Sequence, residues 1–366
     1  MHLFSQRLNC RIYTNFYFPY VLPDLFTDFI TCLFITFIMS VLYLTEQGAT
    51  LRKKSKMLVI DKAGAVLLEV PEFKVKKVLI FGNVQITTQA IAFLFQQGIE
   101  TSFFTLHGKL KGKLTPLESK NVYLRLYQYK RYLDEEFKLR LGKGIIEGKI
   151  KNQIVLLQRH ERNHPENDFS DSIARLHEAI KTLSDKIKIS TIMGVEGTSS
   201  AIYFEAFGRM FRKAVNFERR SRRPPKNPAN ALLSFGYTLI YNEILSILSG
   251  MGFDPYIGYL HAIDYGRPSL ALDMVEEFRH TIVDRLILSL FNRNVLTADD
   301  FEEKDGGVYL KETSRKTFFI HYEKHLQKTF SYEFTETTFR HLFKSQAQKL
   351  SHTIQKNEPY TPFLLK

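Results

Sequence analysis

The stretch GYLHAIDYGRPSLALDMVEEFRHTIVDR, residues 258–285, combines a histidine in a predicted loop with a helix that carries acidic side chains. Pro268 and Ser269 predict the helix start, because proline disfavours a helical residue before it and serine can cap free backbone N–H groups. Four polar residues then recur at intervals of three and four, which places them on one helix face: Asp273, Glu276, Glu277 and His280. Alone, this pattern is typical of a surface helix with solvated acids. Beside His261 it also fits a metal site.

The composition is that of a globular protein with an unusual charge. The chain has 366 residues, enough for two domains, and 44% are hydrophobic. Its 51 Lys and Arg outnumber 38 Asp and Glu, for a net charge of +13, which favours nucleic acid or an acidic membrane surface as a partner. The only two cysteines, Cys10 and Cys32, exclude a disulfide framework and a thiolate metal site in the body of the protein. We expect a reducing, cytoplasmic location.

The first 38 residues differ from the rest in being rich in Phe, Tyr, Ile and Leu. They contain the start of an uncharged run of 17 residues, 29–45, which is short of the roughly 20 needed to span a bilayer. No small-residue cleavage site follows, so a signal peptide fits poorly. We therefore expect no membrane segment, and interpret residues 1–38 as a non-native or disordered extension with Met39 as the working start.

The next segment, residues 39–118, has the pattern of short strands. Val41 and Tyr43 are expected to pair with Leu51 across a turn at residues 46–48. Residues 57–60 and 66–70 flank a turn that contains Gly64, which predicts a β-hairpin. Helical spacing then covers residues 87–98. The segment therefore predicts a small β-rich domain.

From residue 119 to 366 the pattern is helical. Apolar residues recur at helical intervals in four stretches: residues 121–141, 143–160, 171–187 and 230–250. The last of these is apolar but contains Asn242 and Glu243, so we interpret it as a core helix, capped by Asn227 and ended by Gly250. A short extended element over residues 308–319 and helices near 322–330 and 337–355 are expected after it. The tail from Asn357 is expected to be a surface strap or disordered.

Glu196 lies between Gly194 and Gly197 in apolar surroundings. A buried carboxylate needs a partner, because an unpaired buried charge is costly. That partner is a metal cation or, in a purely structural interpretation, an arginine. The two glycines allow a large group to approach the backbone.

A dense basic run follows Glu196 along the chain. It consists of Arg209, Arg212, Lys213, Arg219, Arg220, Arg222, Arg223 and Lys226. Such a run is often only a solvated surface. Close to an acidic metal candidate, it is also what a site that processes phosphodiesters requires.

Together these stretches resemble a known family, the CRISPR-associated adaptation integrase and endonuclease, here called Cas-one. The resemblance is carried, in order, by VLYLTEQGATLRKKSKMLVI, FGNVQITTQAIAFLF, MGVEGTSSAIYFEAF, SRRPPKNPANALLSFGYTLIYNE and GYLHAIDYGRPSLALDMVEEFR. It covers about Met39 to the C-terminus. It implies an α+β fold with a small β-sandwich-like N-terminal domain, residues 39–118, followed by a larger all-α catalytic domain, residues 119–366.

The resemblance also implies a site. By motif match, Glu196, His261 and Glu276 bind a divalent metal, Mg²⁺ or Mn²⁺, and are the catalytic residues, with Asp273 as the second choice of ligand. Glu277 and His280 are then surface or supporting residues. Arg267 and Arg279 are candidates to hold DNA phosphates together with the basic run, or alternatively form structural ion pairs with Glu277 or Asp273.

The implied function is CRISPR adaptation, in which a DNA 3′-OH attacks a phosphodiester and joins new spacer DNA to the array. The implied partners are double-stranded DNA, a second copy of the chain as a homodimer, and a Cas-two dimer. Two alternatives stay open on the residues alone. One is a structure-selective nuclease acting on branched DNA, and the other a DNA-binding scaffold without catalysis. A membrane-tethered protein would rest only on residues 1–45.

Overall fold

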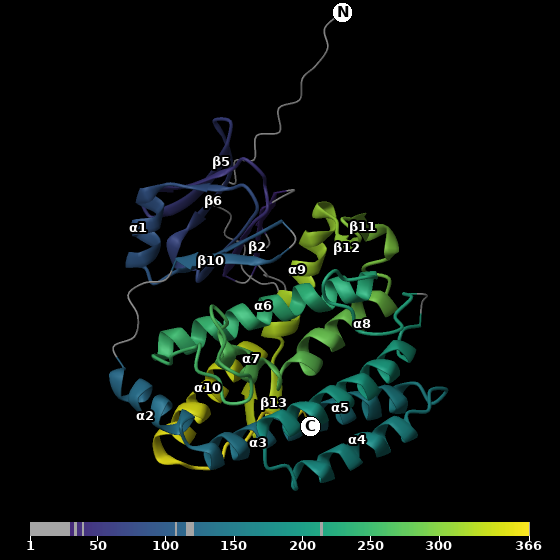
Figure 1. Cartoon of the computed structure of the whole chain (residues 1–366). Helices are drawn as coiled ribbons and strands as arrows, with labels where there is room; N and C mark the ends of the chain where they lie inside the picture. Colours follow the sequence, from purple (N-terminus) through teal and green to yellow (C-terminus); the bar gives the residue numbers. More distant parts are fainter. Residues whose placement is uncertain are drawn as a thin grey trace, which may run out of the picture.

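The structure is a computed structural model that describes residues 30–32, 35–38, 40–106, 108–114, 121–212 and 215–365. An N-terminal β-rich part is packed on a larger helical part (Figure 1). The fold class expected from the sequence is confirmed. The expected domain boundary, 118/119, lies outside the described residues, between the last strand of the first part and the first long helix. It stays a prediction.

The described strands of the N-terminal part form two sheets. The first has the order β1-β2-β3-β7-β9-β10, and the second has the order β6-β5-β4-β8. The strands of the first sheet are β1 Ile30–Cys32, β2 Ile35–Ile38, β3 Val41–Leu44, β7 Lys77–Phe81, β9 Glu100–Phe104 and β10 Leu110–Leu114. The second sheet has β4 Thr50–Lys54, β5 Met57–Lys62, β6 Ala65–Pro71 and β8 Gln85–Ile86, and helix α1 Thr88–Gln96 follows it.

The first sheet is buried on both faces, because alternate residues of its central strands point to different cores. Leu42 and Ile80 pack against the second sheet, and Tyr43 and Phe81 pack against the helical part. β3, β7 and β9 are parallel to one another. One face of this sheet thus completes a β-sandwich, and the other supports the helical domain.

Two expectations for this part need correction. Val41 and Tyr43 do not pair with Leu51, since β3 and β4 belong to different sheets. The physical reason is burial: β3 is buried on both faces and fits the middle of a sheet, whereas most of β4 is exposed. In addition, β1 and β2 lie within the expected extension; β1 pairs with β2, and β2 pairs with β3. Residues 1–29 lie outside the described part of the chain, so the origin of that segment stays a prediction.

The predicted hairpin of β5 and β6 is confirmed. Its turn has positive φ at Ala63 and at Gly64, a conformation that glycine adopts without strain. The last residues of β5 and the first of β6 are exposed, which fits the tip of a hairpin.

The helical part is built mainly from long helices. Its helices are α2 Val122–Tyr132, α3 Glu135–Asn163, α4 Ser170–Leu183, α5 Ile189–Arg209, α6 Pro228–Met251, α7 Ser269–Val275, α8 Arg285–Asn292, α9 Glu312–Gln327 and α10 Phe339–Lys356. Two hairpins, β11 Phe301–Lys304 with β12 Gly307–Leu310 and β13 Phe330–Tyr332 with β14 Thr335–Thr337, lie among them. This part is therefore mainly helical and not strictly all-α, and α9 begins earlier than expected.

Helix α6 is the core helix that the sequence predicts. Asn227 caps it, because its Oδ1 accepts a hydrogen bond of 2.8 Å from the backbone N–H of Asn230. The helix ends at Met251, with Gly252 as its C-cap at φ +94°, and not at Gly250. By length and composition alone α6 could cross a membrane, but 61% of the apolar window is buried inside the protein.

The helix predicted from Pro268 onward is present but irregular. α7 is followed by a turn, by the π-helix η2, Arg279–Asp284, and by α8. Ser269 does not cap α7, since its hydroxyl donates to the carbonyl of Ala262, 2.8 Å away. The π-helix adds residues to one turn and so changes which side chains share a face.

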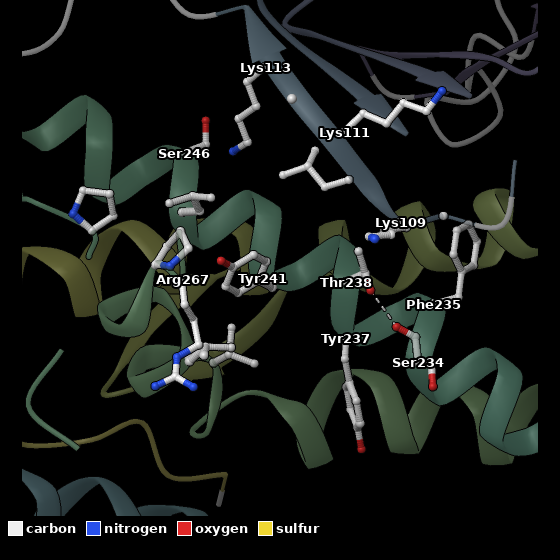
Figure 2. A pocket seen from close by; sticks show the side chains of 18 of the residues that line it. Lys109, Lys111, Lys113, Ser234, Phe235, Tyr237, Thr238, Tyr241, Ser246 and Arg267 are labelled. Carbon is white, nitrogen blue, oxygen red and sulfur yellow. Dashed lines mark hydrogen bonds between the residues drawn. The ribbon is translucent and has the colours of Figure 1, made fainter. Parts of the chain in front are cut away.

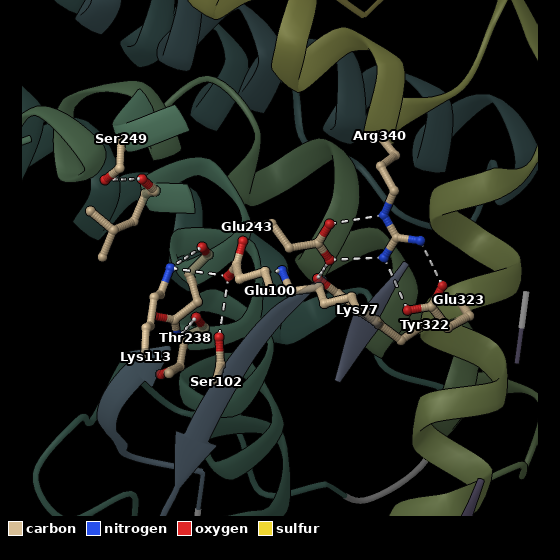
Figure 3. A network of polar contacts seen from close by, with 12 residues as sticks. Lys77, Glu100, Ser102, Lys113, Thr238, Glu243, Ser249, Tyr322, Glu323 and Arg340 are labelled. Carbon is tan, nitrogen blue, oxygen red and sulfur yellow. Dashed lines mark hydrogen bonds and ion pairs between the residues drawn. The ribbon is translucent and has the colours of Figure 1, made fainter. Parts of the chain in front are cut away.

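A polar network connects the two parts of the chain (Figure 3). Arg340 of α10 lies between Glu243 of α6 and Glu323 of α9 and forms ion pairs of 2.9 and 2.8 Å with them. Tyr43 of β3 donates a hydrogen bond of 2.5 Å to Glu323. Lys113 of β10 donates to the backbone of α6, at 2.9 Å. The sheet is thus joined to the helices by buried polar groups as well as by apolar contacts.

Candidate metal centre

Glu196 lies within helix α5, which begins at Ile189, before both flanking glycines. Glycines inside a helix cost roughly 1 kcal/mol each relative to alanine. A Cβ atom at Gly194 or Gly197 would meet no described atom within 4 Å. The surface beside Glu196 is therefore open, as expected for a site that admits a large group.

Glu276 follows the last residue of α7 and is buried, with 3% of its side chain exposed. Its Oε1 forms an ion pair of 3.0 Å with Arg279. Its Oε2 forms an ion pair of 2.7 Å with the ammonium of Lys149. Each oxygen of this buried carboxylate thus faces a cation.

His261 is held by Asp273. The ring Nδ1 of His261 lies 2.8 Å from Oδ1 of Asp273, and the backbone N–H of His261 donates to the same oxygen at 2.9 Å. Since a carboxylate only accepts, Nδ1 carries the hydrogen, and in the neutral ring Nε2 then keeps its lone pair. This arrangement is typical of a histidine that binds a metal through its other nitrogen.

Lys149 of helix α3 links the two glutamates. Its ammonium forms ion pairs with Oε1 of Glu196 and Oε2 of Glu276, and its side chain is only 3% exposed. No sequence motif marks this residue. Its spacing from Ile145 and Ile146 fits the buried face of α3, but a lysine in a long helix is usually solvated, so the spacing alone does not predict its contacts.

The two glutamates are held in their charged form. Burial raises the pKa of each carboxyl, but nearby cations outweigh it and both pKa values lie below the usual range. For Glu196 the main cation is Lys149, and for Glu276 it is Arg279, followed by Lys149 and, when it is protonated, His261. Glu276 therefore lies within electrostatic reach of both Glu196 and His261.

The donor set fits a hard divalent ion, since two carboxylates and one imidazole are ligands that Mn²⁺ and Mg²⁺ accept. As they stand, no three His, Cys, Asp or Glu side chains in the described part of the chain are close enough to hold a metal ion. The ammonium of Lys149 occupies the position between the two glutamates.

Glu277 and His280 are buried, so a surface position is wrong for both, and a supporting role stays a prediction. Glu277 is fully buried and accepts hydrogen bonds from the backbone N–H of Phe363, at 2.6 Å, and from Tyr360. The tail after α10 is therefore packed on the helix, with Phe363 fully buried, and is not a disordered strap. His280 is also buried, with its Nδ1 2.6 Å from Asp284.

Neither Arg279 nor Arg267 forms the ion pair with Glu277 or Asp273 that the sequence left open as an alternative. Arg279 pairs with Glu276, and not with Glu277 or Asp273. Arg267 pairs with Asp264 at 3.2 Å and donates to the carbonyl of Ala262 at 2.6 Å. Arg279 is thus part of the acidic centre, whereas Arg267 stabilises the loop that carries His261.

The basic run does not form one surface. Arg209 packs on the Phe169 ring, and Arg212 contacts His164. Arg220 is turned inward, with hydrogen bonds of 2.8 Å to Asn230 and 2.9 Å to Ser234. Arg219, Arg222 and Arg223 are exposed. Lys226 donates to the carbonyl of Gly306. Lys213 lies outside the described residues.

A basic cleft of about 2000 Å³ lies between β10 and α6 and reaches α7 (Figure 2). Among the described residues that line it, nine are Lys or Arg, and the acids are Glu100 and Asp254. Four of its cations belong to the predicted DNA-binding set: Arg222, Arg223, Arg267 and Arg279. β10 adds Lys111 and Lys113, and the residue before this strand adds Lys109; no sequence motif marks these three lysines.

Residues 42–324 match the family model described as CRISPR associated protein Cas1. The chain belongs to the Cas1 family. This is the family called Cas-one above. A relative from Thermus thermophilus, named CRISPR-associated endonuclease Cas1 3, is 34% identical over 328 residues, which are 88% of this chain and 95% of the relative.

Solved structures of similar fold include Cas1 proteins and a related enzyme. A casposase bound to integration product has a TM-score of 0.80 at 25% identity and covers 90% of this chain and 95% of its own. A Cas1 protein from Thermotoga maritima has a TM-score of 0.75 at 29% identity, with 87% and 97% covered. A chain of a Cas6-RT-Cas1–Cas2 complex, at 24% identity, shares the fold with a TM-score of 0.76 and covers 89% of this chain and 36% of its own.

The match to the Cas1 family model covers residues 42–324. It includes the three proposed ligands and Lys149, and it ends in α9. Helix α10, which carries Arg340, and the tail that contacts Glu277 follow the matched residues.

Proposed function

We propose that this Cas1-family protein is a divalent-metal-dependent DNA endonuclease and integrase that joins new spacer DNA to a CRISPR array. The observation that carries the proposal is the arrangement of Glu196 and Glu276 around a single cation position, with His261 beside it. A divalent ion held there supplies a Lewis acid that polarises a phosphodiester and stabilises the leaving oxygen.

The residues of the chain have separate parts in this reaction. Glu196, Glu276 and the Nε2 atom of His261 would hold the ion, and Asp273 keeps the His261 ring oriented. Arg279 lies next to Glu276 and also lines the basic cleft, so its guanidinium is placed to hold a phosphate close to the acids. When the attacking group is a DNA 3′-OH the product is a joined strand, and when it is water the product is a cut.

The basic cleft supports DNA as the substrate. Its cations come from β10, from residues 222–223 and from the loop of His261, so that three separate segments face one space. Aromatic side chains of α6, including Phe235 and Tyr241, form part of its wall (Figure 2). Cations alternating with aromatic rings are typical of surfaces that bind nucleic acid.

The proposed partners are DNA, a second copy of the chain as a homodimer, and a Cas2 dimer, in the cytoplasm. The casposase of similar fold is described as bound to integration product, and another chain of similar fold belongs to a complex with Cas2. These names support the proposal through the shared fold.

The test uses the full chain with its Cas2 partner, a supercoiled plasmid with a repeat, and a linear DNA with 3′-OH ends. Glu196→Ala should reduce metal-dependent strand transfer by roughly a hundredfold or more, because a ligand is lost, and should leave salt-sensitive DNA binding intact. Glu205→Ala is the matched control, since Glu205 is an exposed acid on the same helix. Joined and cut DNA are separated on a gel, after reaction in the presence of Mn²⁺ or of EDTA.

The same assay separates the alternatives. Cutting of branched DNA without any strand-transfer product would support the structure-selective nuclease. Equal activity of the wild-type and Glu196→Ala chains would overturn the proposed centre. DNA binding without any metal-dependent reaction would support the scaffold.

A further inference from the structure

Lys149 has no part in the reaction proposed above, although it contacts both glutamates of the centre. Its ammonium lies between helix α5, which carries Glu196, and the end of α7, where Glu276 lies. We propose that Lys149 is the resident cation of this site. It holds the two carboxylates together before a divalent ion binds, and the divalent ion must displace it. This inference rests on the proposed function.

The contacts of Lys149 are confined to the site. In the described part of the chain, its hydrogen bonds and ion pairs are to Glu196 and Glu276 alone. Helix α3 places it there, because the side chain leaves the buried face between Ile146 and Ile150, both fully buried. A lysine held at 3% exposure by two carboxylates has little freedom to be anything but their counter-ion.

The charges of the site are balanced without a metal. Two carboxylates, Glu196 and Glu276, face two cations, Lys149 and Arg279. Addition of a divalent ion with both cations in place would leave a buried excess of positive charge, which is unfavourable. Arg279 also lies on the Tyr237 ring and pairs with the other oxygen of Glu276, so Lys149 is the cation that occupies the space between the carboxylates.

The geometry of the ligands agrees with displacement. The oxygens that face each other, Oε1 of Glu196 and Oε2 of Glu276, are both directed at the ammonium. No three acidic or histidine side chains of the described residues form a ready metal cluster while these contacts are in place. A divalent ion therefore gains these oxygens at the expense of their contacts with Lys149.

This role predicts opposite effects with and without metal. In Lys149→Met, which keeps a long unbranched chain but has no charge, the glutamates lose their shared cation. The melting temperature in EDTA should fall. The affinity for Mn²⁺ should rise at least tenfold, because no resident cation competes, and the gain in melting temperature on addition of Mn²⁺ should exceed that of the wild type.

The experiment measures Mn²⁺ binding by the paramagnetic resonance signal of free Mn²⁺, together with melting temperatures in EDTA and in Mn²⁺. Lys151→Met is the matched control. Lys151 lies half a turn along the same helix, is 45% exposed and pairs with Glu147 on the surface. It should change neither quantity.

A second measurement does not depend on a variant that folds. In the wild-type chain with ¹⁵N-labelled lysine, the Nζ signal of Lys149 should move when diamagnetic Mg²⁺ is added, and that of Lys151 should not.

The outcomes distinguish this inference from the proposed function. If the wild type binds Mn²⁺ but Lys149→Met binds it equally or more weakly, Lys149 is not the displaced cation and the inference is overturned. An Nζ signal that stays unchanged while Mg²⁺ binds would also overturn it. If the wild type binds no divalent ion and Glu196→Ala changes nothing, the proposed metal centre is wrong as well.

Discussion

Asp273 shows how one residue can be identified by sequence and reassigned by geometry. Its Oδ2 accepts from the backbone N–H groups of Tyr259, at 2.6 Å, and Leu260, at 3.0 Å, and its Oδ1 accepts from the backbone and ring of His261. Both oxygens are therefore fully engaged. We propose that Asp273 positions His261 and is not itself a metal ligand.

Asp273→Asn should weaken divalent-metal binding by about 10- to 100-fold, as expected when the group that orients a metal-binding histidine is lost. One oxygen becomes an amide nitrogen that cannot accept, so some of the loop N–H groups lose their partner. The free energy of unfolding should fall by about 1–3 kcal/mol. Calorimetric titration with Mn²⁺ and urea unfolding measure the two effects.

Asp264→Asn is the matched control, because Asp264 lies in the same loop but is exposed and pairs only with Arg267 among the described residues. Unchanged metal affinity in Asp273→Asn would contradict the positioning role.

At the scale of single residues, the sequence identifies the acids and the histidine of the candidate site but not the side chains that contact them. Glu196, His261 and Glu276 stand in recognisable motifs. The structure places Glu196 and Glu276 on the same ammonium, that of Lys149, and the joint role of the three residues as ligands stays a prediction. Lys149 could not be predicted from its motif, because a lysine in a long helix is usually solvated, and only its burial reveals its contacts.

The acidic helix shows what regular periodicity cannot predict at the scale of an element. A regular helix would place Asp273, Glu276, Glu277 and His280 on one face. In the structure the turn after α7 and the π-helix η2 direct them differently. Asp273 faces the His261 loop, Glu276 faces α3, and Glu277 faces the C-terminal tail. No sequence pattern here signals a π-helix. The sequence therefore predicts that this segment is helical and where it begins, but not its irregular course.

Helix α6 holds the π-helix in place through close packing at Gly236. A Cβ atom there would lie 2.6 Å from Cγ1 of Val283 in η2. Gly236→Ala should therefore destabilise the protein by about 1–3 kcal/mol through overpacking. This cost should exceed the gain of about 1 kcal/mol in helix propensity. Urea unfolding measures the change.

Gly250→Ala provides the comparison on the same helix, since a Cβ at Gly250 meets no described atom within 4 Å. It should leave stability unchanged or raise it by up to about 1 kcal/mol. A Gly236→Ala chain as stable as Gly250→Ala would show that the contact with Val283 does not constrain η2.

At the scale of the whole molecule, the two parts of the chain are joined by the network around Arg340 (Figure 3). Arg340→Met removes the cation shared by Glu243 and Glu323, both buried. Breaking a buried pair from one side costs about 3–5 kcal/mol, because the remaining charge is left without a partner. We expect a loss of this size in the free energy of unfolding, measured with urea at pH 7.

Lys349→Met serves as the control, because Lys349 lies on the same helix and forms only a surface pair, worth about 1 kcal/mol or less. A loss below about 1 kcal/mol in Arg340→Met would contradict a central role for the network.

The pH dependence gives a further check on the same variant. Burial raises the pKa of Glu243, but Arg340 outweighs it and holds that pKa well below its usual range. In the wild type the stability from this carboxylate is therefore present above about pH 4.3 and lost as the pH falls through the depressed pKa. In Arg340→Met the uncompensated carboxyl has a raised pKa, and its protonation stabilises the fold as the pH falls. The difference between the two chains should shrink from pH 7 to pH 4.

The order of a β-rich part and a helical part could be predicted from the change in periodicity near residue 119. The topology of the sheets could not. β3 and β4 are neighbours in sequence, yet one is buried on both faces and the other is largely exposed, so they belong to different layers. This choice depends on which surfaces meet across the molecule, and no local pattern contains that information.

The burial of the first sheet on both faces also limits how the protein can move. Tyr43 and Phe81 belong to the same apolar cluster as residues of α6 and α9, and Tyr43 stacks on Phe319 with ring centres 4.1 Å apart. Separation of the two parts would expose this shared interior to water. The sandwich and the helices should therefore turn as one rigid body when DNA or a partner subunit binds, so that a force applied to the sandwich is passed directly to the helices that hold the acids.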